Sequence, residues 1–210
     1  SIEKAKTFFK LIEKNKFDFL DVKKINVHPT IEDALSDLLT GKKLVETPDR
    51  KGFKSSNYKS IHSNYQKLMR QDITDDIKLP NSHSFAKHSD KIIKRFAYIQ
   101  SISSVCKNIP QRIKEELGIT KQVLVPLKSD EQAPTITSHP DDMIHYKEPR
   151  ILTVREYARL QSFPDSFIFK GKYTTGGKLR KVEVPRYTQI GNAIPPLFGE
   201  QAGIVLKQLL

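Results

Sequence analysis

Helical spacing of apolar side chains dominates the N-terminal part of the chain. In residues 1–16 apolar positions recur every three or four residues among lysines and glutamates, which predicts an amphipathic helix. Thr30 can cap a second helix over the apolar stripe of residues 31–38. Residues 41–88 show little periodicity apart from a short helical stretch near 65–70, so we expect a long, mostly irregular surface segment there.

The middle of the chain changes from helical to extended patterns. Ser89 can cap one helix, and Pro110 and Gly118 bracket another, because these residue types favour the first turn and the position after the last. Short runs rich in branched residues follow, at 122–127, 133–137 and 143–146. Turn residues separate these runs, so we expect a small sheet in this region.

The C-terminal part returns to helix. Thr153 and Glu156 form the Ser/Thr-x-x-Glu pattern of a capping box, and Pro164 ends the helix that they open. Residues 170–187 are a basic, hairpin-like stretch with a turn predicted at Gly176-Gly177. A terminal helix is predicted beyond Pro195-Pro196, with an apolar stripe formed by Phe198, Ala202, Val205 and Leu209.

The charge balance indicates a class of partner. The 210 residues include 36 Lys and Arg against 24 Asp and Glu, which gives a net charge of +12. A surplus of that size favours a polyanion, most often nucleic acid. A soluble basic protein without such a partner is the alternative that charge alone leaves open.

Cysteine usage and hydropathy indicate the cellular compartment of the protein. The sequence holds one cysteine, Cys106, which excludes an internal disulfide bond and a cysteine-based zinc cluster. Such usage is typical of a reducing compartment, and no apolar run reaches the length of a membrane span. We therefore expect a cytoplasmic protein with no membrane partner.

Residue patterns alone indicate no catalytic machinery. Cys106 has no neighbouring histidine in sequence and is interpreted as a structural thiol. The six histidines lack a metal-binding spacing on a helix, although His83 and His88 could share a site across a loop. Neither a GxxxxGK[ST] loop nor a GxGxxG loop occurs, so no phosphate-cradling site is predicted.

Two C-terminal segments are more specific. RILTVREYARLQSFPD at 150–165 contains Arg-Glu-x-x-x-x-Gln-x-Phe-Pro-Asp, and YTQIGNAIPP at 187–196 contains Gln-x-Gly-Asn-x-x-x-Pro. Together, in this order and spacing, they resemble the last two conserved blocks of the DNA (cytosine-5) methyltransferases. The resemblance extends upstream to about residue 28 through TIEDALSDL, SNYQKLMR, NSHSFAKHSDKIIKRF and APTIT, whereas residues 1–27 match no pattern.

Other blocks of that family are absent from the sequence. A complete enzyme has a Rossmann-like half with a Phe-x-Gly-x-Gly cofactor loop, a Pro-Cys nucleophile loop, a Glu-Asn-Val block and a Gln-x-Arg-x-Arg block. None of these occurs here, and Cys106 follows Val105 rather than proline. The resemblance therefore implies the C-terminal part of such an enzyme, inactive alone, either as a fragment or as the second subunit of a split enzyme.

The resemblance also implies an α+β fold and a division into three parts. Residues 1–40 would form an N-terminal helical segment. Residues 41–150 would form a target-recognition lobe, small and β-rich, with helices around it. Residues 151–210 would belong to the catalytic domain, and the last helix would complete its Rossmann-like methyltransferase fold.

The implied partner is double-stranded DNA. Enzymes of this family flip a cytosine out of the duplex and methylate it at C5. Within the recognition lobe, Thr135 matches the Thr-Leu/Ile element that lies near the DNA backbone in this family. Other polar residues flank the predicted sheet and are further candidates for DNA contact: Lys121, Gln122, Lys128, Ser138 and His139.

The two motif segments would supply support and one wall of the cofactor site. Arg155, Glu156 and Gln161 would orient the recognition lobe on the catalytic lobe, with a surface ion pair as the alternative for the first two. Asn192 and Ala193 would touch S-adenosylmethionine, which the missing half would mainly bind, and Asn192 would cap the terminal helix. No catalytic residue and no metal ligand is assigned to this chain.

Two functions remain open at this point. The first is the DNA-recognising portion of a prokaryotic methyltransferase of restriction-modification type, completed by a catalytic half or subunit with the Pro-Cys loop. The second is a stand-alone DNA-binding or regulatory protein; a remnant without activity is a weaker third. The block at 187–210 favours the first, because a pure binder needs neither a cofactor-side turn nor an apolar terminal helix. Without its partner half, that helix would form an exposed patch or a homodimer.

Overall fold

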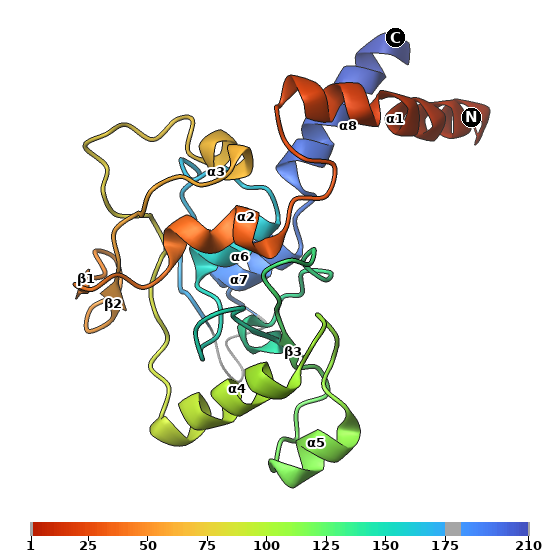
Figure 1. Ribbon diagram of the computed structural model, residues 1–210. Helices are drawn as coiled ribbons and strands as arrows, with labels where there is room; N and C mark the ends of the chain where they lie inside the picture. Colours follow the sequence, from red (N-terminus) through yellow and green to blue (C-terminus); the bar gives the residue numbers. More distant parts are fainter. Residues whose placement is uncertain (1, 175–181, 210) are drawn as a thin grey trace.

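Four short helices meet at the centre of the molecule. The computed structural model describes residues 2–174 and 182–209. Helix α2 (Ile31–Leu35) packs on α6 (Val154–Leu160) and on α3 (Asn64–Met69), and α6 packs on α7 (Arg186–Gly191), as Figure 1 shows. Their buried apolar side chains form one continuous core, so segments far apart in sequence share a single hydrophobic cluster.

Side-chain caps define where these helices begin. The Thr30 hydroxyl accepts a hydrogen bond from Asp33 N at 3.1 Å, and the Asp33 carboxylate accepts one from Thr30 N at 3.0 Å. Thr153 and Glu156 make the same reciprocal pair at the start of α6, which confirms the predicted capping box. Helix α2 continues into a 3-10 turn, η1 (Ser36–Leu38).

A second, smaller core lies beneath α4 (Asp90–Ile102) and α5 (Gln111–Glu116), which sit together at one edge in Figure 1. Both helices were predicted. Gly118 follows the last turn of α5 with φ +61°, the left-handed conformation expected of that position. Ser89 occupies the N-cap position of α4, although its side chain makes no capping hydrogen bond.

Strands are few in the described residues. β1 (Val45–Glu46) pairs with β2 (Lys54–Ser55) in an antiparallel hairpin, and β3 (Val125–Pro126) pairs with β4 (Met143–Ile144) in parallel. A 3-10 turn, η2 (Pro140–Asp142), precedes β4. The α+β class is confirmed in this sparse form, while the β-rich character of the lobe stays a prediction. The predicted turn at Gly176-Gly177 lies outside the described residues.

The expected strand at 133–137 is wrong. The chain just before it bonds to the start of α2 rather than to another strand. Ser129 O accepts a hydrogen bond from Glu32 N at 3.0 Å, and Glu131 O accepts one from Ile31 N at 2.9 Å. These contacts satisfy donors that a helix N-terminus leaves unpaired. The segment is therefore held as an extended loop, not as a strand.

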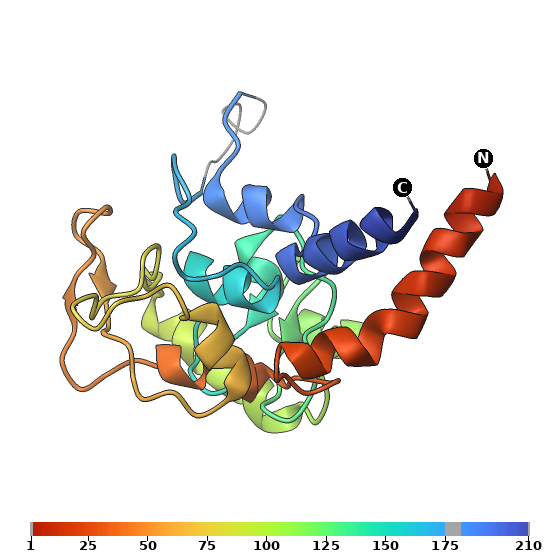
Figure 2. The same ribbon diagram turned by 90° about the horizontal axis from the view of Figure 1, so that it is seen from above.

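The two terminal helices pack on each other and project from the same side of the molecule (Figure 2). Helix α1 (Ile2–Val22) runs beyond the predicted residue 16, because Leu20 packs against the central core. It meets α8 (Pro196–Leu209) through a hydrogen bond of 2.9 Å from Gln201 Nε2 to Ile12 O and a Lys23–Glu200 ion pair of 2.6 Å. Within the described ranges, neither of these helices nor any other is apolar enough over sufficient length to cross a bilayer.

Candidate functional site

Helix α6 carries the first motif segment and is buried from Val154 to Arg159. Three charged side chains, those of Arg155, Glu156 and Arg159, are therefore fully removed from water. A buried charge is costly unless it is paired and hydrogen-bonded. The partners of these side chains show which parts of the chain the helix holds together.

Glu156 pairs with Arg150. Both guanidinium Nη atoms of Arg150 donate to the Glu156 carboxylate at 2.7 Å. Burial would raise the pKa of Glu156, but the Arg150 guanidinium lowers it well below its usual range. His145 Nε2 lies 3.6 Å from the same carboxylate, and burial lowers the pKa of His145 to about 3, so its ring is neutral.

Arg155 binds backbone carbonyl groups. It donates to Asn81 O at 2.9 Å, to Pro164 O at 3.1 Å and to Phe167 O at 2.7 Å. A surface ion pair between Arg155 and Glu156 is therefore wrong, since both are buried and have separate partners. The structure places Arg155 between the loop at residue 81 and the loop after α6; its interlobe role stays a prediction.

Arg159 was missed by sequence reasoning. Its guanidinium binds the Asp37 carboxylate at 2.9 and 3.1 Å and the Asp165 carboxylate at 2.6 and 2.7 Å. Burial would raise the pKa of Asp165, but Arg159 lowers it. One signal was available: Arg155 and Arg159 are four residues apart and so lie on one face of the helix.

The residues that follow α6 contact the C-terminal end of the second motif segment and the start of α8. Gln161 Nε2 donates to Ala193 O at 3.0 Å, and Leu197 N donates to Ser162 Oγ at 3.1 Å. The expected capping of α8 by Asn192 is wrong, because Asn192 is the C-cap residue of α7. Ser162, from the turn after α6, instead satisfies a free N–H at the start of α8.

The predicted cofactor residues lie at the surface. Asn192 is exposed and Ala193 is half-buried, and the next side chain, Ile194, is 70% exposed. The Asn192 carboxamide can both donate and accept hydrogen bonds, which suits the polar groups of S-adenosylmethionine. The turn is open to solvent, and its place in a cofactor site stays a prediction.

Three predicted DNA-contact residues belong to the segment 135–139, which packs against the end of α7 just before this turn. Thr135 and His139 are exposed and Ser138 is half-buried, while Ile136 between them packs into the core. A Cβ atom at Gly191 would lie only 2.5 Å from Thr137 O, so the end of α7 touches this segment directly. A hollow of about 240 Å³ lies between residues 138–140 and 183–188.

The other predicted DNA residues are placed differently. Lys121 Nζ binds Asp141 at 3.0 Å and Asp142 at 2.5 Å, beside His139 in sequence. Burial would lower the pKa of Lys121, but hydrogen bonds to these carboxylates raise it. Gln122 is exposed, and Lys128 Nζ donates to Gln100 O at 3.0 Å, which ties Lys128 to α4 instead.

The cysteine and the two histidines considered for catalysis or metal binding make hydrogen bonds that support the fold. Cys106 Sγ accepts a hydrogen bond from Lys128 N at 3.1 Å, and burial raises the pKa of this thiol to about 11. His83 binds the Thr153 hydroxyl at 2.9 Å, whereas His88 Nε2 accepts from Ile151 N at 3.3 Å, so they do not share a site. Among the described residues, no cluster of His, Cys, Asp and Glu could hold a metal ion.

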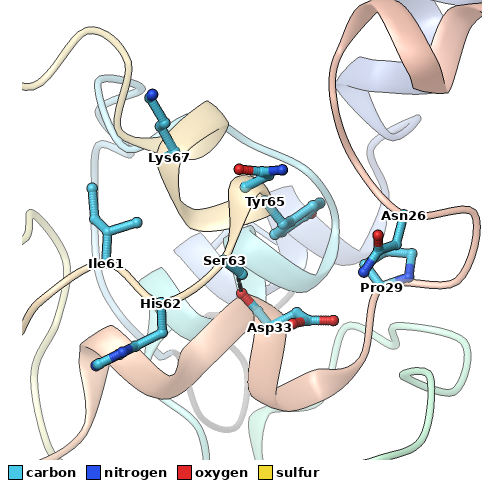
Figure 3. Close-up of a pocket in the computed structure, with 9 residues that line it drawn as sticks. Asn26, Pro29, Asp33, Ile61, His62, Ser63, Tyr65 and Lys67 are labelled. Atoms are coloured by element: carbon cyan, nitrogen blue, oxygen red, sulfur yellow. Dashed lines mark hydrogen bonds between the residues drawn. The ribbon is translucent and has the colours of Figure 1, made fainter.

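A polar hollow of about 420 Å³ lies apart from both motif segments, between residues 26–33 and 61–67 (Figure 3). Ser63 Oγ donates to Asp33 O at 2.6 Å across it. The Asp33 carboxylate already accepts from Thr30 N as part of the α2 cap. The groups that meet here therefore serve the ends of α2 and α3, and this hollow contains no predicted site residue.

Comparisons with known proteins agree with the motif segments. The profile of the family described as C-5 cytosine-specific DNA methylase matches residues 2–208. The type II methyltransferase M.DdeI of Desulfomicrobium norvegicum is 32% identical over 186 residues, which are 82% of this chain and 41% of that protein. M.AquIB of Picosynechococcus sp., also a type II methyltransferase, is 44% identical over 87 residues, which are 40% of this chain and 63% of that protein.

A solved structure from E. coli, described as a DNA modification methyltransferase encoded within a prophage, shares the fold with a TM-score of 0.55 and 20% identity. The alignment covers 85% of this chain and 46% of that one, so this chain spans less than half of both that structure and M.DdeI. Because the family profile covers nearly its whole length, the chain belongs to the C-5 cytosine-specific DNA methylases, and the relatives that it matches include type II methyltransferases.

Proposed function

We propose that this chain is the DNA-recognising C-terminal portion of a DNA (cytosine-5) methyltransferase, and that a catalytic half carrying a reactive cysteine completes it. The observation that carries the proposal is the state of Cys106, the sole cysteine in the sequence. Attack on cytosine requires a thiolate, yet burial raises the pKa of Cys106 to about 11 and its sulfur accepts a backbone N–H. This state supports a nucleophile that another polypeptide segment supplies.

The lengths of the relatives support an incomplete enzyme. This chain spans 41% of M.DdeI, which leaves ample sequence in that relative for a catalytic half. The 87 matched residues are 63% of M.AquIB, whose length is therefore roughly 140 residues. A protein named as a type II methyltransferase can thus be shorter than the present chain. Both a fragment and a separately encoded subunit are consistent with the proposal.

On the DNA side, the proposal assigns the exposed surface around residues 135–139. Thr135, Ser138 and His139 lie together there, and side chains of this kind contact phosphates and base edges. The net charge of +12 would make binding of the duplex strongly salt-dependent. Lys121 neutralises two carboxylates beside this surface, which limits repulsion of a phosphate backbone.

On the cofactor side, Asn192 and Ala193 would form one wall of the site for S-adenosylmethionine, which supplies the methyl group. The catalytic half would provide the rest and dock against α8. Helix α1 covers Val205 and Gln201, but Phe198, Ile204 and Leu206 stay 42–51% exposed. These apolar side chains suit a protein partner, and a second copy of this chain would compete for them when the catalytic half is absent.

Reconstitution tests the proposal. The chain is mixed with a catalytic half that carries the Pro-Cys loop, and transfer of radiolabelled methyl from S-adenosylmethionine to duplex DNA is measured. We expect no transfer by either part alone and clear transfer by the mixture. A Cys106→Ser variant should support the same rate in the mixture, because the proposal gives that thiol no chemical role.

Two results would refute this function. Methyl transfer by the chain unaided would mean that it holds its own nucleophile, and loss of transfer in the Cys106→Ser mixture would identify that nucleophile. Sequence-specific DNA binding that no catalytic half alters, together with no transfer by the mixture, would favour the stand-alone DNA-binding protein instead.

A further inference from the structure

The predicted DNA-side segment and the predicted cofactor-side turn touch through backbone atoms. At Gly191 a Cβ atom would lie 2.5 Å from Thr137 O and 2.7 Å from Ser138 N. Gly191 has no positive φ, so conformational freedom does not explain the glycine. Its absent side chain is what lets the end of α7 approach residues 137 and 138 so closely.

Helix α6 and the turn after it, residues 161–162, support both sides of this contact. Tyr157 Oη donates to His139 O at 2.8 Å on the DNA side. On the cofactor side, Gln161 Nε2 donates to Ala193 O at 3.0 Å and Ser162 Oγ accepts from Leu197 N at 3.1 Å. Helix α6 and the turn that directly follows it therefore hold the backbones of both segments by hydrogen bonds.

The DNA-side segment is also braced within itself. Thr137 Oγ1 donates to the Asp142 carboxylate at 2.7 Å, and Lys121 binds the same residue at 2.5 Å. A displacement of residues 137–139 is therefore not absorbed locally. Because close-packed backbone leaves no slack, such a displacement must reach Gly191 and the adjoining Asn192.

We propose that Gly191, Gln161 and Ser162 are positioning residues that make the binding of duplex DNA and of S-adenosylmethionine interdependent. This inference rests on the proposed function, because it takes residues 135–139 as DNA-side and residues 192–193 as cofactor-side. Each ligand favours the same arrangement of the shared contact, so each raises the affinity for the other by the same factor. The proposal gives none of the three residues a contact with either ligand; they act through Asn192 and Ala193.

The test measures this factor in the complete protein, the chain together with its catalytic half. The dissociation constant of S-adenosylmethionine is determined with and without a saturating target duplex. For the unmodified protein we expect a ratio within the usual range of coupled sites, about 5–150. Gly191→Ala should bring the ratio to within about twofold of unity, because the added methyl separates the two segments.

Milder and matched variants keep the test decisive if Gly191→Ala unfolds the chain. Ser162→Ala removes one hydrogen bond and should reduce the ratio severalfold. Ser166→Ala is its control, since Ser166 is exposed and bonds only to Asp72 at 3.3 Å. This control should keep the unmodified ratio.

A second readout needs no cofactor. Saturating duplex should slow amide hydrogen exchange at residues 192–193 in the unmodified protein and leave it unchanged in Ser162→Ala. Unmodified protein that transfers methyl groups but gives a ratio of one, or a folded Gly191→Ala with an undiminished ratio, would overturn the inference and leave the proposed function standing. A mixture that neither binds duplex nor transfers methyl groups would overturn both.

Discussion

Arg159 on α6 binds both carboxylate oxygens of Asp37, at 2.9 and 3.1 Å, across 122 positions of the sequence. Both side chains are fully buried. The same guanidinium binds the Asp165 carboxylate and the carbonyl oxygen of Ala34. One side chain therefore connects α2 to the end of the first motif segment, residues 150–165. A planar group with five donors is suited to this arrangement, whereas a lysine ammonium is not.

Removing Arg159 should therefore destabilise the chain strongly. We expect Arg159→Met to lower the free energy of unfolding by about 3–5 kcal/mol, because two buried carboxylates lose their main partner. Urea unfolding followed by circular dichroism measures the change. Arg112→Met is the matched control: Arg112 pairs with Glu116 at 3.2 Å on the surface, and its loss should cost less than about 1 kcal/mol. Equal losses in the two variants would contradict this role.

Acid should destabilise the folded chain already below neutral pH. Burial lowers the pKa of His83 to about 4 and that of His145 to about 3, against about 6.5 in an unfolded chain. Above pH 6.5 both rings are neutral in both states. Below it the unfolded chain binds protons that the folded chain does not, so the free energy of unfolding falls by about 1.4 kcal/mol per pH unit for each ring.

The contribution of one ring can be isolated with His145→Asn. The neutral His145 Nδ1 accepts from Lys147 N and Glu148 N at 3.0 and 3.1 Å, and an asparagine carbonyl can accept in its place. Urea unfolding between pH 6.5 and 4.5 should then show a slope smaller by about one proton. Asn57→Ala changes an exposed, uncharged residue and should keep the original slope. An unchanged slope in His145→Asn would show that this ring takes up its proton in the folded state.

Asn192 should affect affinity for the cofactor without affecting stability. In the reconstituted enzyme, we expect Asn192→Ala to raise the dissociation constant of S-adenosylmethionine about tenfold, the effect of losing one hydrogen bond. The side chain is exposed in this chain, so the thermal unfolding temperature should not change. Equilibrium dialysis measures the affinity, with Asn57→Ala, another exposed asparagine, as the control. Equal affinities for the two variants would remove Asn192 from the site.

Substitutions of the residues proposed for DNA contact should differ in how they change the salt dependence of duplex affinity. Lys121 is held by Asp141 and Asp142, so Lys121→Gln should leave the dependence of duplex affinity on salt nearly unchanged. It should instead lower thermal stability, because the buried Asp142 loses its cation. Thr135→Ala and His139→Ala should weaken binding of the duplex at every salt concentration. A salt slope reduced by about 0.9 in Lys121→Gln would instead show a direct phosphate contact.

Local signals made most of the helices predictable. The Thr30 cap and the Thr153/Glu156 capping box depend on residues three apart, so their chemistry is legible without the rest of the fold. The same holds for Gly118 after α5, where the left-handed conformation favours glycine. Candidate residues inside the two motif segments were also found, because order and spacing mark those segments.

Long-range partners were not predictable. The segment at 133–137 has a strand-like pattern, but the backbone just before it bonds to the start of α2, about a hundred residues away. Likewise Arg155 and Arg159 have the charge of surface residues. No neighbouring residue in the sequence indicates that Arg155 binds Asn81 O or that Arg159 binds Asp37. The role of Gly191 depends on its contact with residues 137–138, which is visible only in three dimensions.

Because α1 lies along α8, the two ends of the chain leave the body on the same side (Figure 2). A polypeptide fused ahead of residue 1 and one fused behind residue 210 would thus be delivered to neighbouring places. The end of this chain to which such a polypeptide is joined is then of little geometric consequence. A circular permutation that opens the chain elsewhere should preserve the native arrangement around α6.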